Sequence, residues 1–392
     1  MKKRKKATDN IRPFYVMEIL ERAKEIENEM KCGKTFPFDT VIHLEVGEPD
    51  FPSHENVKKS AVDSIMAGNE KYTHSLGNLN LRKEISNDYR KRYGIDIKPE
   101  RIIIGSGTSP LLLCLFMYLL EKDDEVILMK PYYSGYPNFI YALNAKPVFS
   151  ETDTLNGFEP DINDITGKIS KKTKGILLNN PGNPTGHVLS GDFLKEISKV
   201  SKIYKIPIIS DEIYQGILYD GIKSETILKY TDDAYVLNGF SKYYNMTGWR
   251  LGYMIVPEKS VRSIQNLMQN FFISANAFVQ EAGIAALKSP ESERIDIVKT
   301  YEKRRNFMVE KLKETGFKIP KIPSGAFYIF ADATDFTDDS LKFVNEILEK
   351  TGVACTPGID FGQEGFIRFS YANSMENIKE AMNRLSKFIK NY

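Results

Sequence analysis

The sequence predicts an α/β protein with two domains: a large three-layer domain built on a mostly parallel seven-stranded sheet, and a small α+β domain. Two observations carry this prediction. A chain of 392 residues is long for a single hydrophobic core. Seven apolar runs separated by helical patterns lie between about residues 100 and 257, and a mixed pattern of strands and helices follows. We expect residues 46–289 to form the large domain, and residues 1–45 and 290–392 to form the small one.

The chain begins with a helical pattern. From about residue 13, Ile19, Ala23, Ile26 and Met30 recur at the spacing of one helix face, and Gly33 follows as a stop signal. The basic start "MKKRKK" is followed by "ATDNIRPF" and not by an apolar stretch. We therefore expect a solvated tail and no secretory signal.

The seven apolar runs predict the strands of the large sheet. They are "RIIIGSG", "EVILMK", "KPVFSE", "GILLNN", "IPIISDE", "AYVLNG" and "LGYMIVP". Because they are apolar throughout instead of alternating, they suit strands buried on both faces of a mostly parallel sheet. The intervening segments "SPLLLCLFMYLLEK" and "SGDFLKEISKVSKIY" suit helices that cross from one parallel strand to the next.

The C-terminal part predicts the small domain. A helical stretch covers about residues 260–315. It is followed by "AFYIFADA", "DSLKFVNEILEKTG", "FIRFSYA" and "MENIKEAMNRLSKFI". These segments alternate between strand and helix patterns, as in a small α+β unit.

Composition argues against several classes of function. The net charge of +2 favours neither nucleic acid nor a membrane surface as partner. The longest apolar segment, "LLLCLFMYLL", has ten residues, whereas a membrane span needs about 18. The three cysteines and four histidines lack the spacing of a disulfide framework or a metal site. The sequence therefore favours a cytoplasmic protein without a metal.

Polar motifs follow five of the predicted strands. "GSGTSP" follows "RIII", "PYYSGYP" follows "EVILMK", "NNPGNPTG" follows "GILL", "DEIY" follows "IPIIS", and "GFSK" follows "AYVLN". Each motif by itself is typical of an ordinary turn. In an open parallel sheet, however, ligands bind beyond the carboxyl ends of the strands. Five such motifs at one edge therefore predict a single binding pocket.

The motif "GSGTSP" predicts an anion site. Gly105 and Gly107 precede a helix whose backbone N–H groups can hold a phosphate. Pro110 stands where a dinucleotide fingerprint has its third glycine, which argues against a nicotinamide cofactor.

Two further residues indicate which phosphate compound binds. A buried Asp211 needs a cationic partner, unless it is a helix N-cap. Lys242 lies between small and aromatic residues at a strand end. Both fit pyridoxal 5'-phosphate (PLP), with Lys242 forming the Schiff base and Asp211 keeping the pyridine nitrogen protonated. Arg250 would then neutralise the phosphate.

The motifs resemble a known family. "SKYYNMTGWRLGY" is similar to the lysine signature of the class I/II aminotransferases of fold-type I, the aspartate-aminotransferase-like group. "VGEPDF", "YTHSLGNLNLR", "NNPGNPTG", "SDEIY" and "FIRFSYA" also match, in order and across almost the whole chain. The resemblance implies a PLP-dependent aminotransferase that moves an amino group from an L-amino acid to a 2-oxo acid, with 2-oxoglutarate expected as the acceptor. It also implies a homodimer with shared active sites.

The resemblance implies a role for each matching residue. Lys242 forms the Schiff base and moves the proton between the substrate and the cofactor, and Asp211 pairs with the pyridine nitrogen. By the same resemblance, Tyr214 and Asn183 hydrogen-bond the phenolic oxygen of the ring, and Tyr133 stacks on the ring. The N–H groups of Thr108 and Ser109 and the side chain of Arg250 bind the phosphate. Arg368, Asn183 and Gly47 contact the substrate α-carboxylate, and Tyr72 reaches the phosphate of the neighbouring subunit. The bond Asn183–Pro184 is expected to be cis.

Some of these residues have a purely structural alternative. Tyr133 is then an ordinary core aromatic, Arg368 an arginine on a surface strand, and Tyr72 a tyrosine packed within its own subunit. Two positions depart from the family pattern. Many relatives carry a serine where this chain has Gly239, and some aspartate-specific relatives carry a lysine where it has Ser109.

Two rival functions remain open on the sequence. A PLP-dependent C–S β-lyase or decarboxylase would use the same cofactor residues, because fold and cofactor do not fix the reaction. A non-catalytic regulator with an aminotransferase-like domain would need a DNA-binding module. The residues before "DTVIHLEVGEPD" suit one amphipathic helix instead of a helix-turn-helix. The sequence does not name the amino donor.

Overall fold

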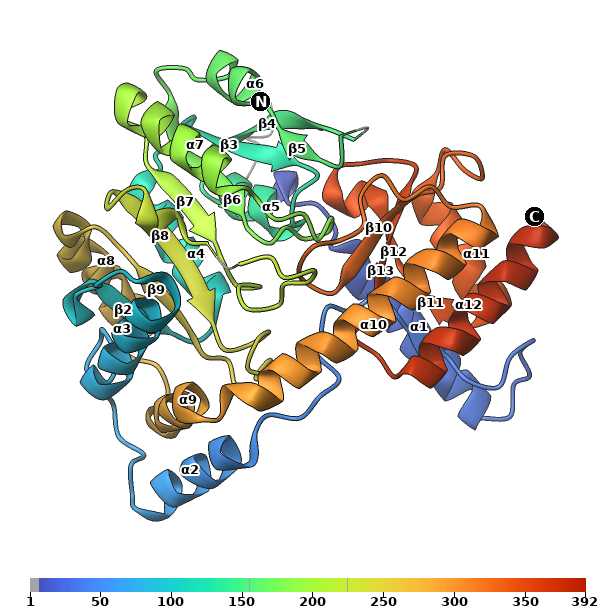
Figure 1. Cartoon of the computed structure of the whole chain (residues 1–392), viewed down its shortest axis with the longest axis horizontal. Coiled ribbons are helices and arrows are strands. Elements are labelled where there is room, and N and C mark those ends of the chain that lie inside the picture. Colours follow the sequence, from blue (N-terminus) through green and yellow to red (C-terminus); the bar gives the residue numbers. More distant parts are fainter. Residues whose placement is uncertain (1–6, 155, 224) are drawn as a thin grey trace, which may run out of the picture.

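The computed structural model describes residues 7–154, 156–223 and 225–392 (Figure 1). The basic start of the chain, for which the sequence predicts a solvated tail, lies outside the described residues. Within those residues, no helix combines the length and the apolar character that crossing a bilayer requires.

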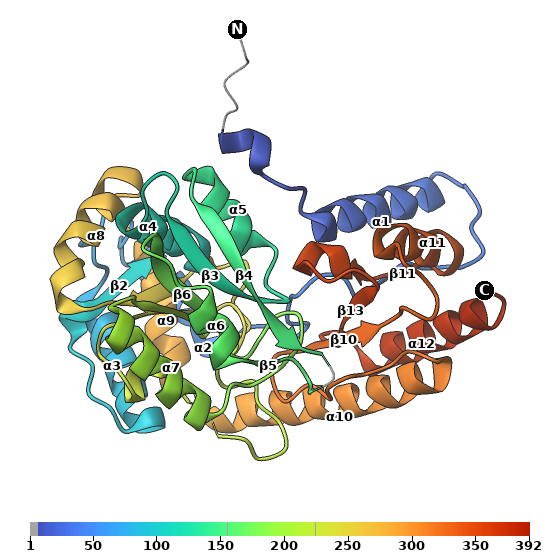
Figure 2. The same ribbon diagram turned by 90° about the horizontal axis from the view of Figure 1, so that it is seen from above.

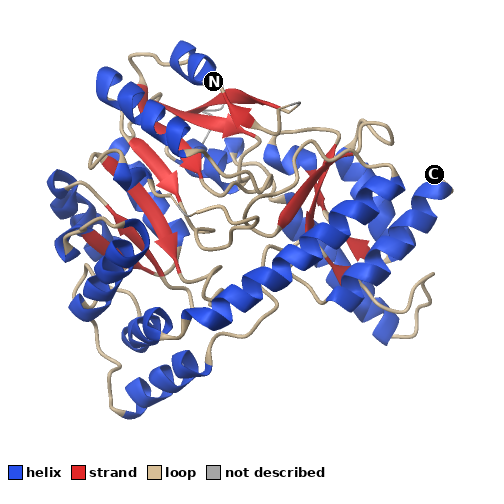
Figure 3. Cartoon of the chain, in the orientation of Figure 1, coloured by secondary structure: helices blue, strands red, loops and turns tan. Residues whose placement is uncertain are grey.

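A sheet of eight strands forms the larger part of the structure (Figures 1 and 3). The spatial order is β2-β9-β8-β7-β6-β3-β4-β5. Neighbours from β8 to β4 run parallel, whereas β9 is antiparallel to both β2 and β8. The strands are β2 (Ile102–Gly105), β3 (Glu125–Lys130), β4 (Lys146–Asp153), β5 (Glu159–Pro160), β6 (Thr173–Asn179), β7 (Ile208–Asp211), β8 (Ala234–Gly239) and β9 (Gly252–Ile255).

All seven predicted strands are present in this sheet. The addition is β5, a two-residue edge strand antiparallel to β4. Two residues carry no periodicity, so a sequence pattern has no means of indicating such a strand.

Helices cover both faces of the large sheet, which confirms the predicted three layers. In β2 the side chains of Ile102 and Ile104 pack into one apolar core and Ile103 into another, on the opposite face. The first core contains residues of α2 (Glu55–Met66), α3 (Leu79–Tyr93), α6 (Ile162–Gly167), α7 (Gly191–Tyr204) and α9 (Ala277–Lys288). The second contains residues of α4 (Thr108–Leu119), α5 (Gly135–Ala142) and α8 (Glu258–Phe271). Burial on both faces explains why the strand sequences are continuously apolar.

A second, smaller unit lies beside the large sheet (Figures 1 and 2). It holds an antiparallel sheet in the order β10-β13-β12 and a parallel pair, β1 with β11. Its elements are α1 (Tyr15–Lys31), β1 (Ile42–His43), α10 (Glu291–Thr315), β10 (Tyr328–Asp332), α11 (Ser340–Thr351), β11 (Val353–Ala354), β12 (Thr356–Pro357), β13 (Phe366–Ser370) and α12 (Met375–Lys390). Four 3₁₀ turns complete the described elements: η1 (Ala7–Asn10), η2 (Pro99–Arg101), η3 (Ile227–Lys229) and η4 (Gly358–Phe361).

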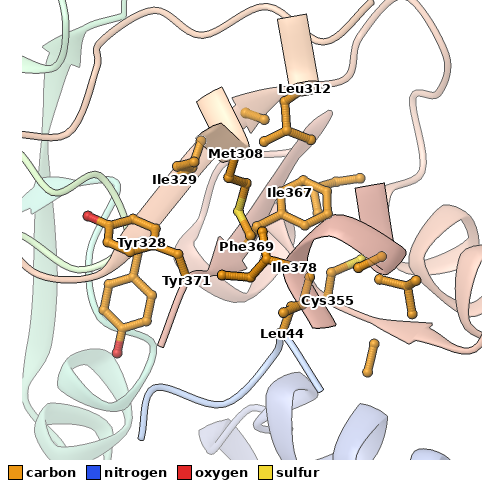
Figure 4. Packing of buried hydrophobic residues seen from close by; sticks show 14 of the residues in the cluster. Leu44, Met308, Leu312, Tyr328, Ile329, Cys355, Ile367, Phe369, Tyr371 and Ile378 are labelled. Carbon is orange, nitrogen blue, oxygen red and sulfur yellow. The ribbon is translucent and has the colours of Figure 1, made fainter. Parts of the chain in front are cut away.

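The two chain ends meet in this smaller unit. Ile42 pairs with Val353 in the parallel β1–β11 ladder. Figure 4 shows part of the apolar core that they share, which includes Leu44, Cys355 and Ile367. The predicted domain boundaries at residues 46 and 290 stay a prediction.

The helical stretch predicted over about residues 260–315 is three helices, α8, α9 and α10. One break is a loop at residues 272–276, in which Ile273 has a positive φ of 62°. The other break comes at Pro290, which stands directly before α10. Proline has no N–H to donate to the helix and disfavours a helical conformation in the residue before it.

Candidate active site

A cavity of about 320 Å³ lies at the carboxyl ends of the large sheet, as the sequence predicts. It takes residues from the loops after β3, β6, β7 and β8 and from the start of α4. Of the predicted site residues, its lining includes Gly47, Thr108, Ser109, Tyr133, Asn183, Asp211, Tyr214, Lys242 and Arg250. Arg368 contacts Asn183 at the edge of this group, and Tyr72 lies elsewhere.

Lys242 extends into the cavity from the turn after β8. Its Nζ donates a hydrogen bond to the Gly47 carbonyl oxygen at 2.6 Å and lies 5.9 Å from the centre of the Tyr214 ring. Burial lowers the pKa of the Lys242 amine to about 8, and the nearby Arg368 and Arg250 add to this effect. A lysine with a lowered pKa supplies more of the neutral, nucleophilic amine near neutral pH.

Asp211 ends strand β7 and is only 9% exposed. Its Oδ2 accepts a hydrogen bond from the Tyr136 hydroxyl at 2.7 Å, and its Oδ1 accepts one from the Ile213 N–H at 3.1 Å. Among the residues that the structure describes, no lysine, arginine or histidine lies within ion-pairing distance of this carboxylate. Burial raises the pKa of Asp211. A buried carboxylate in this setting suits a ligand that brings its own positive charge.

The N-cap alternative for Asp211 finds only partial support. The bond from the Ile213 N–H is the kind that a capping aspartate makes. The residues that follow Asp211, however, form a turn and not an α-helix.

Arg368 is held rigidly on β13, with 4% of its surface exposed. Its Nη1 donates to Asn183 Oδ1 at 2.9 Å, and its Nη2 donates to the Glu45 carbonyl oxygen and to Thr356 Oγ1. Its guanidinium stacks over the Tyr328 ring at 4.4 Å. An arginine so deeply buried differs from the surface arginine of the structural alternative. Its fixed planar group suits a carboxylate.

Asn183 lies in the loop after β6, and its bond to Pro184 is cis, as predicted. Its backbone N–H donates to Asn179 Oδ1 at 2.7 Å, while Asn179 Nδ2 donates to the Asp211 carbonyl oxygen at 3.1 Å. Asn179 therefore ties this loop to the end of the neighbouring strand. Tyr214, from the turn after β7, shares a 2.8 Å hydrogen bond with the Tyr328 hydroxyl.

A candidate anion site lies where α4 begins. Gly107 precedes the helix with a φ of 91°, and no side chain caps the helix end. The first-turn N–H groups of Thr108 and Ser109 therefore remain free for a ligand, and the helix dipole favours a negative charge there. Arg250 lies against this end, because a Cβ added to Gly107 would stand 2.6 Å from Arg250 Nη2. Arg250 Nη1 is anchored to the Thr247 carbonyl oxygen at 2.9 Å.

The two remaining aromatic residues occupy different environments. Tyr133 lines the cavity and packs edge-on against Phe14 and Tyr136, at 6.0 and 5.2 Å between ring centres. Burial raises the pKa of Tyr133 to about 12. Tyr72 is 81% exposed, so it is not packed within its own subunit as the structural alternative supposed.

Several residues of the site escaped the sequence analysis. Tyr136 lies three residues after Tyr133 in "PYYSGYP", one helical turn away, which is a usable signal. Asn179 is the first asparagine of "NNPGNPTG". Tyr328 belongs to a continuously apolar strand segment, and nothing in such a segment indicates which side chain faces a site.

Gly239, one of the departures from the family pattern, has a structural explanation. It pairs directly with Gly252 across the β8–β9 ladder. A Cβ on Gly239 would stand 3.0 Å from both Gly252 Cα and the Leu251 carbonyl oxygen. A serine at this position would crowd the neighbouring strand.

Comparison with known proteins gives a family for this site. A model of the family "Aminotransferase class I and II" matches residues 39–385. The chain belongs to the class I and II aminotransferases. It is a PLP-dependent transaminase with the α/β fold of the aspartate aminotransferases.

Individual relatives match this aminotransferase over nearly its whole length. It is 38% identical over 387 residues to a (5-formylfuran-3-yl)methyl phosphate transaminase of Methanocaldococcus jannaschii, covering 97% of this chain and 98% of that protein. It is 38% identical over 383 residues to an aspartate aminotransferase of Pyrococcus horikoshii, covering 96% and 95%. The crystal structure of the aspartate aminotransferase of Thermotoga maritima matches with a TM-score of 0.91 at 34% identity, covering 99% of this chain and 100% of that one.

The residues of this aminotransferase fit its cofactor. The buried Asp211 carboxylate lacks a cationic side chain, the start of α4 presents free N–H groups beside Arg250, and Lys242 has a lowered pKa. These three features match a protonated pyridine nitrogen, a phosphate and an aldehyde, which PLP carries together.

Proposed function

We propose that this aminotransferase transfers the amino group of an L-amino acid to a 2-oxo acid, with 2-oxoglutarate as the acceptor and Lys242 as the residue that binds the cofactor covalently as a Schiff base. The observation that carries the proposal is the Lys242 amine, which burial brings to a pKa of about 8 inside the cavity. Bound PLP supplies an electron-accepting ring that stabilises negative charge at the substrate Cα.

In this proposal, the residues of the chain divide the work of holding the cofactor. Asp211 pairs with the ring nitrogen, and Tyr214 and Asn183 hydrogen-bond the phenolic oxygen. Tyr133 stacks on one face of the ring. The phosphate is bound by the N–H groups of Thr108 and Ser109 and by Arg250, which the local geometry supports.

The substrate is oriented by its α-carboxylate. Arg368 binds this group with Asn183, and the absence of a side chain at Gly47 leaves room for it. The available space is narrow, since a Cβ on Gly47 would stand 1.8 Å from the Tyr328 hydroxyl. A fixed carboxylate sets which bond to Cα is weakened. The Lys242 amine, which is freed when the substrate amine takes its place on the cofactor, would take the proton from Cα as a positioned general base and return it to the cofactor.

We further propose a homodimer with shared active sites, in which Tyr72 reaches the phosphate of the neighbouring subunit. Tyr72 is 81% exposed, and two further large apolar side chains, Phe271 and Ile273, are 56% and 48% exposed close to Ser274 in the sequence. The Thr73 N–H donates to Ser274 Oγ, so the segment that carries Tyr72 is joined to the one that carries Phe271 and Ile273, and together they form an exposed apolar patch. Such a patch on a protein surface favours contact with another chain.

We also propose a cytoplasmic location and the two-domain division at residues 46 and 290. The three cysteines are unpaired: Cys32 is exposed, and Cys114 and Cys355 are buried. Free thiols are typical of a reducing compartment.

A single-turnover screen tests the proposed reaction. The holoenzyme is mixed with individual L-amino acids without an acceptor, and the visible absorbance of the lysine-bound cofactor is followed. We expect at least one amino acid to discharge this absorbance with release of the matching 2-oxo acid, and 2-oxoglutarate to restore it. Release of carbon dioxide or of a thiol instead would support a decarboxylase or a β-lyase. The named substrates of the relatives differ, so the screen must be broad.

The covalent role of Lys242 is tested separately. Borohydride reduction of the holoenzyme followed by peptide mapping should place the cofactor on Lys242. The Lys242→Ala protein should fold, bind the cofactor without a covalent bond and turn over no substrate. A label on a different lysine would refute the assignment.

A further inference from the structure

Tyr136 connects two parts of the site that come from different elements. It is the second residue of α5 and is 2% exposed. Its hydroxyl donates a 2.7 Å hydrogen bond to Asp211 Oδ2, at the end of β7. Its ring packs edge-on against Tyr133, with 5.2 Å between ring centres and an angle of 78°. One side chain therefore touches both the residue assigned to the ring nitrogen and the residue assigned to the ring face.

We propose that Tyr136 is a positioning residue that keeps the Asp211 carboxylate ionised and directed at the cofactor's ring nitrogen. The inference rests on the proposed pairing of Asp211 with that nitrogen. It assigns to Tyr136 a defined contribution to the reaction: the ring accepts electrons only while its nitrogen holds a proton, and the proton stays there only while Asp211 remains an anion.

The contacts of Asp211 explain why one hydroxyl matters. Burial disfavours the carboxylate form, and only the Tyr136 hydroxyl and the Ile213 N–H are hydrogen-bonded to its oxygens within the described structure. A hydrogen bond to the charged form of a buried acid stabilises that form. Removal of the Tyr136 hydroxyl would leave Oδ2 without its donor.

Other ionisable groups around Asp211 are less suited to this task. Lys242 favours the carboxylate through its charge, but in the proposed function its amine is bound to the cofactor. The remaining groups disfavour a negative charge on Asp211 or are neutral, and they are Glu212, directly after β7, and the tyrosines Tyr133 and Tyr214. Burial raises the pKa of Tyr136 well above its ordinary value, so Tyr136 keeps its proton and donates throughout the working pH range.

The test follows the protonation of the ring nitrogen directly. The holoenzyme is loaded with PLP that carries ¹⁵N in the ring, and the ¹⁵N resonance is recorded for the wild type and for Asp211→Asn. The Asn variant marks the position of a nitrogen without an anionic partner. We expect Tyr136→Phe to move the resonance part of the way toward the Asn variant and to weaken PLP binding about tenfold, the typical effect of one charge-assisted hydrogen bond.

Two controls separate the hydroxyl from the packing of the ring. Tyr132→Phe removes a neighbouring hydroxyl from a ring that stacks on Phe149, and it should leave the ¹⁵N resonance unchanged. 3-Fluorotyrosine at position 136 keeps the ring and strengthens the donor, so the resonance should move away from the Asn variant. This second change needs no loss of packing, so it remains informative if Tyr136→Phe fails to fold.

The outcomes distinguish two kinds of failure. If Asp211→Asn moves the resonance while Tyr136→Phe and the fluorotyrosine variant do not, the inference about Tyr136 is wrong and the pairing of Asp211 stands. If Asp211→Asn itself leaves the resonance in place, the proposed pairing is wrong, and the inference about Tyr136 falls with it.

Discussion

Two residues of the site, Lys242 and Asp211, have pKa values that burial shifts toward the neutral form of the side chain. Lys242 has a pKa of about 8 against an ordinary 10.5, because burial disfavours its charged form. Asp211 has a raised pKa for the same reason. Both pKa shifts favour the neutral form of the side chain. A bound cofactor whose charges are opposite to those of Lys242 and Asp211 would offset both shifts. Perturbed groups that converge in one cavity are typical of catalytic sites.

The lowered pKa of Lys242 predicts how the stability of the cofactor-free protein depends on pH. Below about pH 8 the folded protein must bury a charged amine, whereas above about 10.5 the amine is neutral in both states. Between these values the unfolded chain binds more protons, so this group makes the free energy of unfolding rise with pH. We expect Lys242→Met to be more stable than the wild type at pH 7, with the difference shrinking as the pH approaches 10.

Chemical denaturation of both proteins from pH 6 to 10 measures this difference, which isolates Lys242 from other titrating groups. A difference that stays constant with pH would contradict the prediction. A gain in stability on losing a residue of the proposed active site would be the usual trade-off between stability and function.

Arg368 predicts a uniform effect on substrates. Arg368→Lys keeps the charge but loses the planar group that bonds Asn183 and Thr356. We expect kcat/KM to fall about 10–100-fold for every amino acid and every 2-oxo acid, because the α-carboxylate is common to all of them. Steady-state kinetics over a panel of substrates measures it. A loss of kcat/KM for acidic substrates alone would instead place Arg368 at the end of the pocket that binds the substrate side chain.

At the scale of elements, the site depends on where helices and strands begin and end. The start of α4 meets the turn that carries Arg250, and the two meet closely only because Gly107 has no side chain. The ends of β6 and β7 are tied together through Asn179, which fixes Asn183 relative to Asp211. Each loop is therefore positioned by its neighbour and by the rigid sheet beneath it.

The close approach at α4 predicts the effect of one methyl group. Gly107→Ala would place a Cβ 2.6 Å from Arg250 Nη2 on a backbone with a φ of 91°. We expect a loss of about 1–3 kcal/mol in the free energy of unfolding and weaker PLP binding. Thermal denaturation and PLP titration measure the two effects. Gly248→Ala is the matched control, because nothing lies within 4 Å of a Cβ there and the residue is two positions from Arg250. Equal behaviour of the two variants would contradict the proposed phosphate site.

At the scale of the whole molecule, the smaller unit supplies Arg368 and Tyr328 to the site from strands β13 and β10 of its three-stranded sheet. These residues contact Asn183 and Tyr214, which lie in the loops that follow strands of the large sheet. The exposed patch around Tyr72 adds a third contributor in the proposed dimer, a second copy of the chain.

The shared site predicts complementation between two inactive or weakened subunits. Tyr72→Phe and Lys242→Ala chains are unfolded, mixed in equal amounts and refolded with limiting PLP. In a mixed dimer, one site holds both the intact lysine and the intact tyrosine. Random pairing makes about half of the dimers mixed, so about a quarter of all sites should bind PLP with normal affinity. Titration of PLP against the mixture measures this fraction. Binding that is only the average of the two parents would show that Tyr72 does not cross the interface.

The sequence by itself determined seven strands of the large sheet and predicted most of the residues that line the proposed cofactor site. Short apolar runs such as those in β2 and β6 favour strands buried on both faces, and the polar motifs that follow parallel strands then converge at one edge. Only the tertiary structure decided the rest. The break at 272–276, the short strand β5 and the hydrogen bonds of Tyr136 and Tyr328 depend on contacts between distant segments. A local pattern records how often a side chain is apolar along one element. It carries no information about which side chain of another element lies opposite, and such partners hydrogen-bond Asp211 and bury Arg368.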